Sequence, residues 1–171
     1  IQALRPHPGQ VRSAARIYAL LQGSEIDASH HDDFGHKVQD AYSLRCAPQV
    51  HGAVRDTIDY ARPVFAIELG SVVANPIVFA AEGNVVSGGN FHGQPLAFAL
   101  DYLAIAVTEL GSISERRIDR LLDPHRSSGL TPFLATNPGV SSGYMITQYT
   151  AAAIVAQNRV FSHPASVESI P

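Results

Sequence analysis

The sequence of 171 residues has one cysteine, no tryptophan and charges that nearly cancel. Cys46 cannot form a disulfide within the chain, which fits the reducing cytoplasm, where we expect this protein to act. The net charge is −3 and no basic stripe is present, so a nucleic-acid partner is not expected. The length fits a single segment, residues 1–171, of ordinary domain size.

Long apolar runs are also scarce. The most apolar one, Leu96 to Val107, contains Asp101 and is shorter than the roughly 20 residues that a bilayer span needs. Residues 1–16 hold three arginines and no apolar segment typical of a signal peptide. We therefore expect a soluble protein without a membrane partner. Because the chain begins with Ile1 and ends at Pro171 without a capping or tail signal, we expect it to be an internal piece of a longer protein.

The spacing of apolar residues predicts four helices. They cover residues 8–21, a stretch starting at Pro48, residues 95–122 and residues 144–161. The helix after Pro48 has one apolar stripe, formed by Val50, Val54, Ile58, Ala61 and Phe65. Residues 96–110 and 144–156 are apolar on most faces, so other segments or subunits must cover them. The polar half of the 95–122 helix is expected to reach solvent or a partner, and its apolar half to lie in a core.

A small β element interrupts these helices. Three runs are rich in β-favouring residues: 72–73, 77–79 and 85–86. The sequence Glu82-Gly83-Asn84 between the last two predicts a hairpin turn. The fold class is therefore mainly α, a bundle of long helices with a β-hairpin insertion near 72–87.

Residues 24–37 form a polar stretch that we expect to be a loop. It holds clustered imidazoles and carboxylates, namely His30, His31, Asp32, Asp33 and His36. Such groups can hold a metal ion, and a metal protein using His30, His31 and Asp33 is one alternative. The spacing matches no established ligand motif, so a solvated loop is the favoured interpretation and no metal is expected.

Two short stretches carry side chains suited to chemistry. Gln39, Tyr42 and Arg45 lie three residues apart, which places an amide, a phenol and a guanidinium on one side of a helical turn. Arginine binds carboxylates with two parallel hydrogen bonds. Asn90, Phe91 and His92 lie between glycines just before a helix. Spacing alone favours a plain helix start for the first stretch, and explains the second equally well as a plain loop.

Three stretches together resemble the aromatic amino-acid lyase family, which includes the histidine, phenylalanine and tyrosine ammonia-lyases and related aminomutases. They are Gln39–Gly52, Gly88–Pro95 and His163–Pro171, in the family's order and across the whole chain. The last of them, together with His92, resembles the histidine-specific branch. The resemblance implies an ammonia-lyase/fumarase-like helical bundle, assembled as a homotetramer, that eliminates ammonia from L-histidine to give urocanate during histidine degradation.

The resemblance also implies roles for individual residues. Arg45 matches the arginine that grips the substrate carboxylate, and Tyr42 a tyrosine close to the substrate and the reactive electrophile. Gln39 matches an amide near the prosthetic group.

The loop residues match further positions of the family. Asn75 matches an asparagine near the substrate and the prosthetic group, Phe91 an aromatic residue beside the electrophile, and His92 a substrate-binding position. A turn asparagine and a core phenylalanine are the plain alternatives for Asn75 and Phe91.

The family's electrophile is a methylidene-imidazolone, formed autocatalytically from an Ala-Ser-Gly tripeptide that this chain lacks. The resemblance places that tripeptide and a catalytic tyrosine before Ile1, and a glutamate after Pro171. Gly70 and Ala74 stand where the family usually has asparagine and aspartate. We therefore expect this chain to be inactive by itself. The alternatives are the phenylalanine or tyrosine branch, an aminomutase, and a non-catalytic helical assembly module.

Overall fold

The computed structural model describes residues 1–29 and 39–168 and is mainly helical, as the sequence predicts. The helices are α1 (Pro8–Leu21), α2 (Glu25–Ser29), α3 (Tyr42–Arg45), α4 (Ala47–Leu69), α5 (Gln94–Leu122) and α6 (Met145–Phe161), with 3-10 turns at Gln2–Leu4 and Pro132–Leu134. The strands are β1 (Ile77–Phe79) and β2 (Asn84–Val86).

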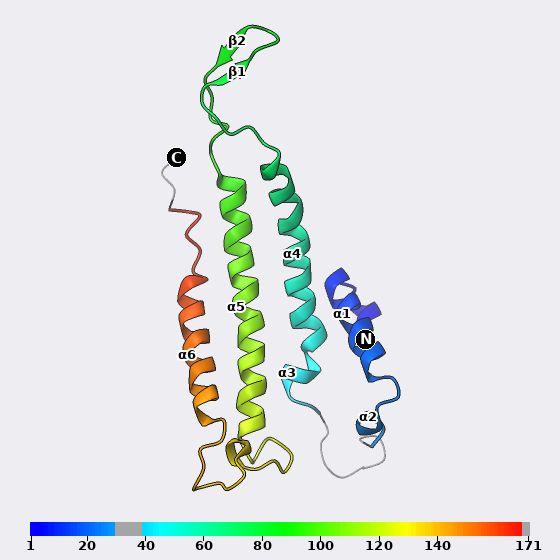
Figure 1. Cartoon of the computed structure of the whole chain (residues 1–171). Helices are drawn as coiled ribbons and strands as arrows, with labels where there is room; N and C mark the ends of the chain where they lie inside the picture. Colours follow the sequence, from blue (N-terminus) through cyan, green and yellow to red (C-terminus); the bar gives the residue numbers. More distant parts are fainter. Residues whose placement is uncertain (30–38, 169–171) are drawn as a thin grey trace.

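The long helices lie in a row. Figure 1 shows α4, α5 and α6 side by side, with neighbours running in opposite directions, and α1 beside α4. The β-hairpin projects from the end of the row where α4 ends and α5 begins. The short helix α3 lies at the opposite end, where α4 begins. A row of this kind covers α4 and α5 on two sides, covers α1 and α6 on one side, and leaves their other faces open.

Proline marks the start of three of the four long helices. Pro8, Pro48 and Pro95 each occupy one of the first two positions of α1, α4 and α5. Proline suits this place because the first amides of a helix have no partner within the helix. The predicted bounds of α1 are confirmed, and those of α5 and α6 agree to within one residue. For α4 the sequence predicts only the start, which also agrees to within one residue.

The hairpin is confirmed as well. Strands β1 and β2 pair antiparallel, with Val78 opposite Val85. The turn between them includes Gly83 at φ +66°, a backbone conformation that favours glycine. The β-favouring residues Val72 and Val73 are not part of a strand, so that part of the prediction is wrong. They lie at the base of the hairpin, where Asn90 Nδ2 donates to the carbonyl oxygen of Val72 at 2.6 Å.

The stretch expected to be a loop begins with a helix, so that prediction is also wrong in part. Helix α2 follows Ser24, whose hydroxyl accepts a hydrogen bond from the amide of Asp27 at 3.2 Å and so caps the helix. The metal alternative uses His30, His31 and Asp33, which lie outside the described part of the chain, as do Asp32 and His36. Across residues 1–29 and 39–168, no group of three histidine, cysteine or acidic side chains could hold a metal ion.

Burial along α5 runs opposite to the prediction. Large apolar side chains in its first half are about half exposed, including Phe98, Leu100 and Val107, and only the small Ala99 and Ala106 are buried there. The polar second half contains the buried Glu115 and Asp119. The reason is that one row of helices cannot surround the apolar half, while the acidic groups of the second half have partners. The cover that the apolar half needs must come from outside this row.

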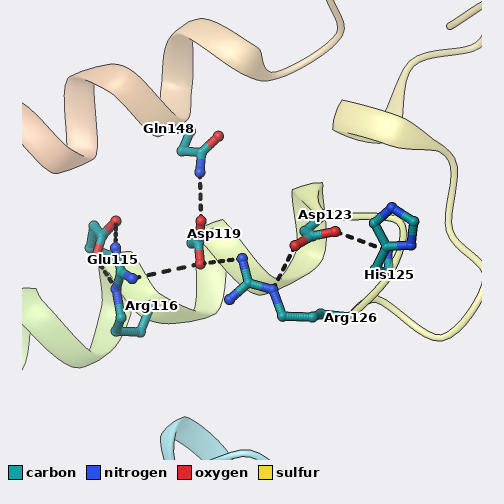
Figure 2. Close-up of polar contacts among 7 residues, drawn as sticks. All are labelled: Glu115, Arg116, Asp119, Asp123, His125, Arg126 and Gln148. Atoms are coloured by element: carbon teal, nitrogen blue, oxygen red, sulfur yellow. Dashed lines mark hydrogen bonds and ion pairs between the residues drawn. The ribbon is translucent and has the colours of Figure 1, made fainter.

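Paired charges explain how acidic residues are buried at this end of α5, as Figure 2 shows. Both carboxylate oxygens of Glu115 accept hydrogen bonds from Arg116. Asp119 accepts from Gln148 of α6 at 2.6 Å and pairs with Arg126 at 2.9 Å. Each buried carboxylate therefore has a charged partner, as burial of an ion requires. The contact with Gln148 also joins α5 to α6.

Two glycines bring α1 and α4 into backbone contact. A Cβ atom on Gly9 would lie 2.1 Å from the carbonyl oxygen of Gly52, and one on Gly52 would lie 2.4 Å from the backbone of Gln10. The amide of Gly9 also donates to the Asp56 carboxylate at 2.7 Å. Any larger residue at either position would force the two helices apart.

In the described part of the chain, α5 alone has the length and hydropathy of a membrane span, with a mean hydropathy of 1.6 over 18 residues. The expectation that no segment is long enough is therefore wrong by this measure, because the helix extends on both sides of the apolar run. Core helices of bundles have the same composition. Helix α5 is joined along its side to α6, where Thr108 Oγ donates to the carbonyl oxygen of Asn158 at 3.2 Å.

Candidate active site

The three side chains predicted to share one side of a helical turn lie together, although only Tyr42 and Arg45 are on that turn and Gln39 precedes it. They form a group that we name the Arg45 cluster: Gln39, Tyr42 and Arg45. The Arg45 guanidinium lies over the Tyr42 ring, 4.8 Å from its centroid, and donates to the side-chain oxygen of Gln39. Tyr42 is 73% exposed, so the cluster faces outward from this chain. A guanidinium has five N–H donors, and those not used by Gln39 can bind a carboxylate.

The backbone under this cluster is held by a residue far away in the sequence. Arg117 of α5 donates twice to the carbonyl oxygen of Ser43, from Nε at 3.0 Å and from Nη2 at 2.9 Å. Its Nη2 also lies 3.1 Å from Nε2 of His51 on α4. Because arginine has no acceptor, His51 Nε2 must accept here, and the neutral ring carries its hydrogen on Nδ1.

Burial lowers the pKa of His51 from its ordinary value, and the charges of Arg117 and Arg55 lower it further. The neutral form that Arg117 requires is therefore the favoured one. No pattern in the sequence predicts this contact, because 74 residues separate Arg117 from Ser43.

The other predicted site residues, Asn75, Phe91 and His92, belong to the segment 70–93, which we name the Phe91 loop. The side-chain oxygen of Asn75 accepts from Ser87 Oγ and from the amide of Gly88, both at 3.0 Å. Asn75 thus braces the base of the hairpin. Phe91 is 57% exposed. The Nδ1 of His92 accepts from the amide of Gln94 at 3.2 Å, which leaves Nε2 to carry the hydrogen of the neutral ring.

An open cavity of about 470 Å³ adjoins this loop. It is lined by Phe91, His92, Gly93, Gln94, Ala97, Ala165 and Ser166. The structure therefore brings together two of the stretches that were singled out in the sequence.

The segment after α6 is fastened to α5 beside this cavity. The Asp101 carboxylate accepts from the amides of Ala165 and Ser166 at 3.1 and 2.8 Å, and Gln94 donates to the carbonyl oxygen of Ser166 at 2.8 Å. The hydrogen bonds from Ser166 hold the pKa of Asp101 below its usual value. Asp101 interrupts the apolar run in order to bind this segment, a role that sequence reasoning missed.

The Arg45 cluster and the Phe91 loop lie at opposite ends of the row of helices (Figure 1). Helix α4 separates them, and its 23 residues span about 35 Å at 1.5 Å per residue. An amino-acid substrate is far shorter than this helix. One copy of the chain therefore cannot place both groups around the same substrate.

The fold and these residues fit a lyase built from long helices, and the comparisons identify the family. The family model described as "Aromatic amino acid lyase" matches residues 1–171, and the chain belongs to this family.

Relatives of known name agree with this assignment. The chain is 57% identical to the histidine ammonia-lyase of Anaeromyxobacter dehalogenans and 58% identical to that of Deinococcus radiodurans. Each match covers 100% of this chain, and 34% and 32% of the respective relative. The structure also resembles the tyrosine aminomutase of Streptomyces globisporus, with a TM-score of 0.81 and 43% identity over 98% of this chain and 35% of that one. The chain thus spans about a third of the length of these proteins.

Proposed function

We propose that this chain forms the central part of a histidine ammonia-lyase, which eliminates ammonia from L-histidine to give urocanate in histidine degradation. The observation that carries the proposal is the identity of 57–58%, along the whole chain, to proteins of that name. The exposed guanidinium of the Arg45 cluster supports it, because an amino-acid substrate always presents a carboxylate. With Cys46 as the only cysteine, we propose the cytoplasm as the place of action.

The Arg45 cluster would bind and orient the substrate. Arg45 can form two parallel hydrogen bonds with the substrate carboxylate, while Gln39 fixes the guanidinium from its other side. Tyr42 packs under the guanidinium, so its phenol is held next to the bound substrate, where it can donate or accept a hydrogen bond.

The Phe91 loop fits the family's methylidene-imidazolone, although the Ala-Ser-Gly tripeptide that forms this group is not in the chain. The side-chain oxygen of Asn75 is bound within the loop, so its Nδ2 donors remain for an outside acceptor. Phe91 offers an exposed aromatic face beside an open cavity. When bound, this electrophile makes ammonia a better leaving group; Asn75 and Phe91 would hold it in place.

We propose that the complete site takes the Arg45 cluster from one copy and the Phe91 loop from another, within a homotetramer. Support comes from the length of α4, which keeps the two groups about 35 Å apart in one copy. The half-exposed apolar side chains of α5 also support it, since burial between subunits would remove them from water.

Turnover by the complete protein tests the proposal. We expect it to release urocanate from L-histidine, measured by absorbance, and this chain alone to release none. Arg45→Lys should lower kcat/KM by roughly tenfold or more, because lysine cannot bind a carboxylate with two parallel bonds. Arg16→Lys, at an exposed position of α1, is the matched control and should leave turnover unchanged. Conversion of L-tyrosine or L-phenylalanine in place of L-histidine would refute the assignment and favour another branch or an aminomutase.

A further inference from the structure

We propose that Arg117 is a positioning residue that sets the geometry of the Arg45 cluster through the backbone of Ser43. The inference rests on the proposed function, because it assigns Arg117 a role in binding the substrate carboxylate. Arg117 lies on α5, whereas the cluster lies on α3 and the residues just before it. The contact therefore joins two elements that are distant in the sequence.

Helix α3 cannot fix its own orientation. It has four residues and no side-chain cap at its first end. Helices of a single turn are not stable by themselves, because their few hydrogen bonds do not offset the lost chain entropy. Some outside contact must therefore hold the turn that presents Tyr42 and Arg45.

Arg117 supplies that contact at the carbonyl oxygen of Ser43, within the helical turn that carries Tyr42 and Arg45. Ser43 is buried, with 8% of its surface exposed, and a buried carbonyl near the end of a helix needs a partner. Two N–H groups of one guanidinium bind this oxygen, which fixes direction as well as distance. Ser43 lies between Tyr42 and Arg45 in the chain, so its orientation determines where both side chains point.

His51 fixes Arg117 in turn. Its Nε2 lies 3.1 Å from Nη2 of Arg117, and it belongs to the early part of α4. The guanidinium is therefore held between the carbonyl oxygen of Ser43 and the imidazole of His51. This arrangement links α3, α4 and α5, so the Arg45 cluster keeps a defined place relative to the long helices.

A double-mutant cycle in the complete protein tests the inference. We expect Arg117→Met to raise KM for L-histidine roughly tenfold, with a smaller change in kcat, because charge-assisted hydrogen bonds of this kind are lost. In an Arg45→Met background the same change should have almost no further effect on KM, since Arg117 acts through Arg45. Arg120→Met, one turn further along α5, is the control and should leave KM unchanged in both backgrounds. An unchanged KM, or an equal increase in both backgrounds, would overturn the inference.

Amide hydrogen exchange gives a second readout that does not depend on activity. The amides of Leu44, Arg45 and Cys46 are bonded within the α3 turn. These amides should exchange faster in Arg117→Met than in wild type, and at the wild-type rate in the control Arg120→Met. Exchange at the wild-type rate in Arg117→Met would overturn the inference. If Arg117→Met does not fold, Arg117→Lys serves in both experiments, because it keeps the charge and loses the paired donors. A wild-type protein without turnover refutes the proposed function, while the exchange result still decides the role of Arg117.

Discussion

Two inactive variants of the complete protein should restore activity in each other when they assemble together. Arg45→Ala removes the carboxylate-binding guanidinium, and Phe91→Ala removes the aromatic face of the other loop. In one copy these residues are separated by the length of α4, about 35 Å. If each site takes one group from each of two copies, a mixed assembly contains sites in which both groups are intact.

The size of the effect follows from counting. When the two variants are produced in equal amounts and mix at random, the copy supplying Arg45 is the Phe91→Ala chain in half of the sites. The copy supplying Phe91 is the Arg45→Ala chain in half of the sites, independently. About one quarter of the sites are then fully intact, as expected for random assembly of a symmetric oligomer. Urocanate formation should reach about a quarter of the wild-type rate, while either variant alone gives almost none.

A matched mixture sharpens the result. The double variant Arg45→Ala/Phe91→Ala, mixed equally with wild type, should retain about a quarter of the wild-type rate if sites are shared between copies. It should retain about half if each site lies within one copy. Two results together would refute the shared site. The mixture of the two single variants would show no more activity than the sum of the separate variants, and the mixture of the double variant with wild type would retain half of the wild-type rate.

Three further predictions concern stability, and unfolding midpoints measure all of them. Gly52→Ala should destabilise the fold by about 2 kcal/mol, because the added Cβ would meet the backbone of α1. The control Gly111→Ala should not destabilise it, because the nearest neighbours of that Cβ lie 3.9–4.0 Å away and alanine has the higher helix propensity. Equal unfolding midpoints for the two variants would contradict the close contact between α1 and α4. Asp119→Ala should cost about 2 kcal/mol because hydrogen bonds to charged groups are lost, and an unchanged midpoint would count against the pairing in Figure 2. The pKa of His51 is lowered in the folded state, so its contribution to stability is present above the ordinary pKa of about 6.5 and is lost as pH falls through the folded value. Between about pH 7 and pH 5 wild type should therefore lose more stability than His51→Gln, and parallel pH profiles would contradict this.

Local signals in the sequence predict the long elements well. Apolar spacing and proline positions define α1 and α5, and the Glu82-Gly83-Asn84 turn defines the hairpin. Tyr42 and Arg45 share one helical turn, as their spacing predicts. Gln39 precedes that turn and joins the cluster through its hydrogen bond with Arg45. These features depend on residues within one or two turns of each other, which is the range that sequence patterns describe.

Contacts between distant segments were not predictable in this way. Nothing in the pattern around Arg117 indicates that its guanidinium binds Ser43, because that contact depends on how α3 and α5 are placed. The burial of Glu115 likewise depends on its pairing with Arg116 and not on hydropathy. The roles of Asn75, Phe91 and His92 toward a substrate remain predictions from the family resemblance.

The glycine contact between α1 and α4 has a consequence for the order in which the helices unfold locally. The buried residues of α1 are Gly9, Gln10 and Ser13, while Tyr18 and Leu20 are each 69% exposed. The helix is thus located by close backbone approach and buries little apolar surface, which is the main source of docking free energy. We expect α1 to detach before α4 and α5 under native conditions, so its amides should lose protection while those of α4 and α5 keep theirs.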